Sequence, residues 1–253
     1  MTKYIYSFLI FSILSLNAIT ILADTDTKPK NKVSNEHHYV VNMAYQGKVK
    51  LPLNDNLVDI NTSRELVIRH ITNQMADDKS VMVELNVISG HQMLGEDKLL
   101  IDPRIYPKLT AILTNDNNLK ELYGTQKPDP NEMPAINYSN MIILFILPDY
   151  NQDKQVGDTW DYEIKIPSME QTFKFANTIS KDDSKTITIK QNINQILQNS
   201  NSSLTAESES IFDKASRRLL STTVDCNVSR KLTGKDEGKE EKINIKITIT
   251  EAK

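Results

Sequence analysis

Few side chains in this sequence have the types and spacing that chemistry needs. Its four histidines are His37, His38, His70 and His91, so the C-terminal half has none. The single cysteine, Cys226, would need a histidine or a positive helix end beside it to become a nucleophile, and only long-range pairing with His70 or His91 could provide one. Zinc ligands recur at fixed spacing on rigid elements, and these residues lack such spacing. We therefore expect no catalytic residues, no metal site and no cofactor.

Other catalytic and ligand-binding motifs are absent from this sequence or incomplete in it. No serine lies in a Gly-x-Ser-x-Gly turn, and the seven glycines are too scattered for a phosphate-binding loop. The polar stretch 149–153 resembles the start of a calcium loop, but Lys154 and Trp160 stand where that loop needs glycine and glutamate. The acid pairs at 77–78 and 182–183 are typical of tight turns. A hydrolase assembled from distant carboxylates is therefore only our third hypothesis.

The N-terminal residues 1–23 have the composition of a targeting segment. Lys3 gives a positive start, residues 5–16 an apolar core, and Ala23 a small-residue cleavage site. We expect a cleaved secretory signal. The alternative is an uncleaved anchor, because residues 4–23 match the roughly 20 residues that span a bilayer. Residues 24–36 are polar and predict a flexible tether, so the protein is expected to be exported, periplasmic or extracellular.

Alternation of apolar and polar residues runs through much of the remaining chain. It is clear over 160–166, which begins with Trp160, the only tryptophan, and over 242–250, where four isoleucines alternate with polar residues. Cys226 lies in a third such segment, where a thiol packs as a small apolar side chain. Alternation with a period of two gives a strand one apolar and one wet face. The sequence predicts an all-β fold with at most one or two short helices.

One apolar run, Met141–Leu147, does not alternate. Seven apolar residues in a row fit either a buried strand or two helical turns. The shortness of the run and its Ile and Phe content favour a strand only weakly, so helix and strand both stay open.

Two hairpins, 71–89 and 176–194, resemble each other around turns that contain Asp77 and Asp182. We interpret this similarity as an internal duplication. It divides the chain into a first β-unit at 37–124, a linker at 125–140 and a second β-unit at 141–253. Short connections favour antiparallel meanders. The two units are expected to form a large curved sheet, a half-barrel or a sandwich.

A short junction motif carries a family resemblance. Leu147 and Pro148, followed by Val-Gly-Asp-Thr-Trp at 156–160, resemble a group of uncharacterised secreted bacterial proteins with a tandem β-rich domain. The layout is more loosely similar to the curved half-barrel of Lol-type lipoprotein carriers. Neither resemblance implies catalytic residues that match this chain.

These observations favour a non-enzymatic binding protein of the cell envelope. We expect a hydrophobic, lipid-like ligand or a protein partner, with Trp160, Tyr162, Phe173 and Phe175 lining a ligand groove or a groove between the units. For Trp160, a core position is the favoured interpretation. The alternative function is a structural or assembly component of the envelope without a ligand cavity. A net charge of -3 with interspersed signs gives no basic face, so nucleic acid is not expected as a partner.

Overall fold

The computed structural model describes residues 34–50, 56–75, 80–114, 117–124, 136, 138–147, 153–166, 171–197 and 201–252. The predicted targeting segment 1–23, the tether up to residue 33, the turn aspartates 77–78 and most of the acidic loop 149–153 lie outside these residues.

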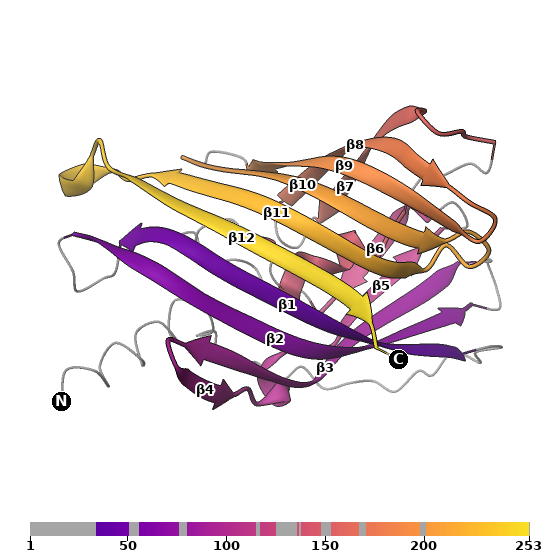
Figure 1. Cartoon of the computed structure of the whole chain (residues 1–253), viewed down its shortest axis with the longest axis horizontal. Coiled ribbons are helices and arrows are strands. Elements are labelled where there is room, and N and C mark those ends of the chain that lie inside the picture. Colours follow the sequence, from indigo (N-terminus) through magenta and orange to yellow (C-terminus); the bar gives the residue numbers. More distant parts are fainter. Residues whose placement is uncertain are drawn as a thin grey trace.

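The described chain is all-β, as its alternation predicts. Twelve strands form one antiparallel sheet in the order β6-β5-β3-β2-β1-β12-β11-β10-β9-β8-β7, with β4 paired to β3 (Figure 1). The strands are β1 (Ser34–Lys50), β2 (Leu57–Gln74), β3 (Val81–Leu94), β4 (Asp97–Leu100), β5 (Leu109–Leu113), β6 (Leu119–Tyr123), β7 (Thr159–Ile166), β8 (Gln171–Asp182), β9 (Thr186–Leu197), β10 (Ser202–Asp213), β11 (Leu219–Lys231) and β12 (Glu240–Glu251).

The sheet curls into a barrel that is nearly closed, with a seam between its two edge strands, β6 and β7. Each half of the chain is an antiparallel meander. The first runs from the middle of the sheet to the β6 edge, and the second runs from the β7 edge back to the middle. There β1 pairs with β12 in a register from Tyr39–Glu251 to Lys48–Lys242. The expected curved sheet is therefore confirmed, and both similar hairpins are present as β2–β3 and β8–β9.

Alternate residues of the long strands point into the barrel and form its core, whereas β4 is exposed along its whole length. On β12 the inward residues Ile245, Ile247 and Ile249 are at most 1% exposed. Cys226 on β11 is fully buried between two inward valines, which confirms its predicted role as an apolar side chain. At the β8–β9 turn the Asp183 carboxylate accepts the backbone N–H groups of Lys185 and Thr186, the turn chemistry expected of that acid pair.

Two boundaries differ from the prediction. Strand β1 already begins at Ser34, so the last residues of the expected tether belong to the sheet. The weak preference for a strand at Met141–Leu147 is wrong, because Tyr138–Leu144 is a 3-10 helix, η2. Without alternation the run has no wet face, and a segment that is apolar on all sides is buried on all sides. The shorter 3-10 turns are η1 (Pro103–Ile105) and η4 (Gly234–Asp236).

Candidate functional site

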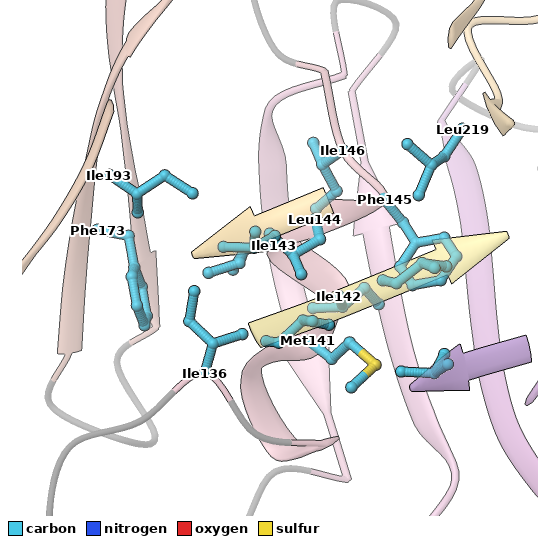
Figure 2. Close-up of a cluster of buried hydrophobic side chains, with 14 of the residues drawn as sticks. Ile136, Met141, Ile142, Ile143, Leu144, Phe145, Ile146, Phe173, Ile193 and Leu219 are labelled. Atoms are coloured by element: carbon cyan, nitrogen blue, oxygen red, sulfur yellow. The ribbon is translucent and has the colours of Figure 1, made fainter. Parts of the chain in front are cut away.

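The interior of the barrel is occupied by the chain's own apolar segment. We call this segment, Ile136 together with residues 138–147, the plug. The described side chains of the plug are between 0% and 7% exposed and belong to the same hydrophobic cluster as the inward residues of the sheet. Figure 2 shows the plug side chains from Met141 to Ile146 surrounded by strands, with Ile136 on the side of Phe173 and Ile193.

The plug touches opposite walls of the barrel. On one side Tyr138 Oη donates to the Leu85 carbonyl of β3 at 3.0 Å. On the other side Asn140 Nδ2 lies 3.5 Å from Gln171 Oε1 on β8, a long hydrogen bond. The Ile136 backbone lies beside the Cys226 thiol of β11, where it opposes the rise in the pKa of that thiol caused by burial. These contacts place the plug across the interior rather than in the sheet.

At one end of the barrel the plug finishes in an aromatic cluster. The ring of Phe145 stacks on His70 of β2 at 5.5 Å and meets Tyr39 of β1 edge-on at 5.1 Å. Tyr39 Oη donates to the Leu219 carbonyl at 2.6 Å, and burial raises the pKa of Tyr39 to about 12. Burial, reinforced first by His37 and then by the positive charge of Arg218, lowers the pKa of His70 to about 4. His70 is therefore neutral at physiological pH, and its Nδ1 has no hydrogen-bond partner.

The predicted groove residues come together on the inner wall of β7 and β8. Tyr162 and Phe175 are register partners whose rings stack at 4.5 Å, and Phe173 is fully buried beside them. Trp160 is only partly buried, and the Lys154 ammonium lies 5.1 Å above its ring. Trp160 therefore packs at the margin of the core, whereas the other three face the interior that the plug fills.

The inner wall of the second half also holds a polar network that the sequence reasoning missed. Gln191 Nε2 donates to Asn177 Oδ1 at 3.0 Å and to Tyr162 Oη at 3.3 Å, while its Oε1 accepts from Ser208 and Ser210. All of these side chains are buried. The signal was present in the sequence as Asn, Gln and Ser at inward positions of otherwise alternating strands.

A second inward glutamine, Gln195, lies four residues further along β9 and has a different environment. It is 7% exposed, and neither its Nε2 nor its Oε1 has a hydrogen-bond partner. Its register partners are Phe173 on β8 and Leu204 on β10. An unpaired amide in apolar surroundings costs about 1–3 kcal/mol for each group left without a partner.

Among the described residues, no group of three or more His, Cys, Asp or Glu side chains could hold a metal. Cys226 is fully buried, and burial raises the pKa of its thiol to about 12, so it is not a thiolate at neutral pH. His70 and His91 lie on β2 and β3, where His70 contacts Tyr39 and Phe145, and His91 pairs with Glu65.

The outer face of the sheet carries shallow polar hollows. One of about 580 Å³ lies over β9–β12, and its floor holds Asn, Thr, Asp and Glu side chains. Within it the Asn244 amide donates to Asp225 and Asn227, so these groups pair with one another.

The sequence matches no protein-family model, and it finds no match among curated proteins. Within the described residues, no helix has the length and apolar character needed to cross a bilayer.

Proposed function

We propose that this protein is an exported, non-enzymatic carrier that binds a hydrophobic, lipid-like ligand inside the barrel, in exchange for the plug. The observation that carries the proposal is the plug itself. A continuous apolar segment fills the interior as a separate element. Its side chains make the apolar contacts with the inner wall that an acyl chain would make.

The contacts of the plug are of a kind that a bound ligand could replace. Each described hydrogen bond between the plug and the rest of the chain involves a side chain of one partner, and most of the burial of the plug is apolar packing, which is non-directional and roughly proportional to area. A ligand of similar apolar surface would regain most of that energy. The inner wall around it is lined by aromatic and aliphatic residues, including the predicted Tyr162, Phe173 and Phe175. Export is proposed from the composition of residues 1–23.

A disulfide lock on the plug tests this proposal. Ile136→Cys is designed to form a disulfide with Cys226 under oxidising conditions, because the Ile136 backbone lies beside the Cys226 thiol, and loss of both free thiols confirms the bond before binding is measured. The reduced variant should bind oleate and the dye Nile red as the unmodified protein does. The oxidised variant should bind them at least about tenfold more weakly, since its plug cannot leave. Ile136→Cys combined with Cys226→Ser cannot form the bond and is the control.

Two results would reject the proposal. If no form of the protein binds either probe, the interior is not a ligand site. If the oxidised and reduced variants bind equally, the ligand does not replace the plug.

The second candidate is a structural or assembly component of the envelope that holds no ligand. The specific observation in its favour is that the described plug side chains are at most 7% exposed, so the core is complete without a guest. Native mass spectrometry of protein purified from its own envelope separates the two. A co-purified lipid supports the carrier, whereas a bare mass and a stable protein partner support the alternative.

A further inference from the structure

One part of the plug, residues 140–147, is amphiphilic. Asn140 lies within the plug, is fully buried and directly precedes the apolar run Met141–Leu147, so this part has a neutral amide head and an apolar tail. That head lies against Gln171 of β8. Whatever takes the place of the plug must offer Gln171 an equivalent polar group or leave it unpaired.

Gln195 lies on β9, the strand next to β8, and is the diagonal neighbour of Gln171 across the two strands. Phe173 pairs with Gln195, and Gln171 pairs with Leu197, so the two glutamines face inward at the same end of the barrel. Gln195 has no partner for either amide atom, although Gln191 on the same strand has four. On the same face of β9, the amide of Gln191 is therefore fully hydrogen-bonded, whereas the amide of Gln195 has no partner. Gln195 is also the glutamine next to Gln171, which the amide head of the plug contacts.

We propose that Gln171 and Gln195 form the head-group subsite of the barrel and recognise an uncharged group that both donates and accepts hydrogen bonds, such as a hydroxyl or an amide. This inference rests on the proposed carrier function. A glutamine amide presents one donor group and one acceptor, so a group with both is its complement.

The charges near this subsite favour a neutral head group. Arg230 occupies an inward-facing position of β11, two strands from Gln195. Its Nε already pairs with Glu241 at 2.6 Å. The direct register neighbours of Gln195 are apolar. An anionic carboxylate buried there would lack a counter-charge, which is costly in an apolar interior.

Three lipids with the same acyl chain test this subsite in the full chain by displacement of Nile red. Monooleoylglycerol donates and accepts hydrogen bonds, methyl oleate only accepts, and oleate is charged. We expect the unmodified protein to prefer monooleoylglycerol. Gln195→Met should weaken monooleoylglycerol binding by about three- to tenfold, the value of one or two neutral hydrogen bonds, without weakening methyl oleate. Asn194→Ala, which faces outward beside it, is the control and should change neither.

The outcomes separate the two proposals. If all three lipids displace the dye but Gln195→Met keeps the original preference, the subsite is wrong and the carrier function stands. A preference for oleate over monooleoylglycerol in the unmodified protein would also overturn the subsite. If none of the lipids displaces the dye, the carrier function fails, and the subsite fails with it.

Discussion

Single residues inside this barrel differ in whether their polar atoms are paired. Gln191 is paired through four side chains, whereas Gln195 and the Nδ1 of His70 have no partner. Buried polar atoms without partners are uncommon in folded proteins, so each one marks either a stability cost or a contact with something else. These residues therefore give the most direct tests of the structure.

The two glutamines should respond oppositely to the same change. Gln191→Met removes the hydrogen bonds of the Asn177 Oδ1 and of the Ser208 and Ser210 hydroxyls, although Ser210 keeps Thr222, and should lower the free energy of unfolding by about 1–3 kcal/mol. Gln195→Met removes two unpaired atoms and should leave stability unchanged or raise it. Urea denaturation of the two variants measures the difference. Equal losses in both would show that the Gln195 amide is paired after all.

His70 should make the protein sensitive to acid. Its folded pKa of about 4 lies below the ordinary value of 6.5, so the unfolded chain binds the proton more readily. The neutral imidazole is therefore compatible with full stability above pH 6.5, and stability falls as the pH drops from there toward 4. Between pH 7.5 and 5 the loss from this group is about 2 kcal/mol.

The pH dependence can be assigned by substitution. In His70→Phe the ring stacks on Phe145 without titrating, so this part of the acid sensitivity should disappear from urea denaturation curves. His38→Gln is the control, because His38 is exposed and pairs with Glu36. The remaining charges at this end, His37, Arg218 and Glu251, are unchanged in both variants. An identical pH profile in His70→Phe and the parent protein would contradict the assignment.

At the scale of elements, β12 and the plug decide whether the core exists. Strand β12 joins the two meanders, since it pairs with β1 on one side and β11 on the other. Its inward isoleucines pack in the same cluster as the plug. A substitution on the inner face of β12 should therefore destabilise both halves of the chain.

Ile247→Lys puts a charge at a fully buried position of β12 and should prevent stable folding. Thr248→Lys, the adjacent outward position, should fold with nearly unchanged stability because that side chain reaches water. Far-ultraviolet circular dichroism with thermal denaturation compares them. A melting temperature for Ile247→Lys close to that of the parent would show that this face is not core.

Phe145→Ala tests the plug as a packing element. Truncating a buried phenylalanine costs about 3–5 kcal/mol when the surroundings cannot collapse, and here the His70 and Tyr39 rings also lose their contact. Exposed Ile88 on β3 is the comparison, and Ile88→Ala should cost less than about 0.5 kcal/mol. A small loss for Phe145→Ala would mean that the plug is only weakly bound, which would favour exchange with a ligand.

At the scale of the whole molecule, the two sequence units share one sheet and one core. The first and last strands are hydrogen-bonded neighbours, and inward residues of both meanders pack on the same plug. We therefore expect a single cooperative unfolding transition.

Trp160 makes this prediction measurable. As the only tryptophan it reports on β7 at the edge of the second meander, whereas far-ultraviolet circular dichroism reports on all strands. The two signals should give the same midpoint and slope in urea. Separate transitions would show that the halves unfold independently despite the β1–β12 pairing.

Most of the local structure follows from the pattern of residues along the chain. Period-two alternation identified the isoleucines of β12, the segment after Trp160 and the position of Cys226, because one-sided burial leaves a repeating pattern in a strand. It also placed Tyr162, Phe173 and Phe175 on an apolar face. The ambiguity at Met141–Leu147 could not be resolved in this way, because a run that is apolar on every side has no period.

What those apolar faces enclose depends on contacts between distant parts of the chain. Closure depends on how the twist of the eleven strands from β6 to β7 adds up and on β12 pairing with β1, and both are relations between residues far apart in the chain. The same holds for the pairing of Gln191 and the lack of it at Gln195, which alternation alone cannot distinguish. The plug entered the barrel because an apolar segment without a wet face is most stable where no side of it meets water.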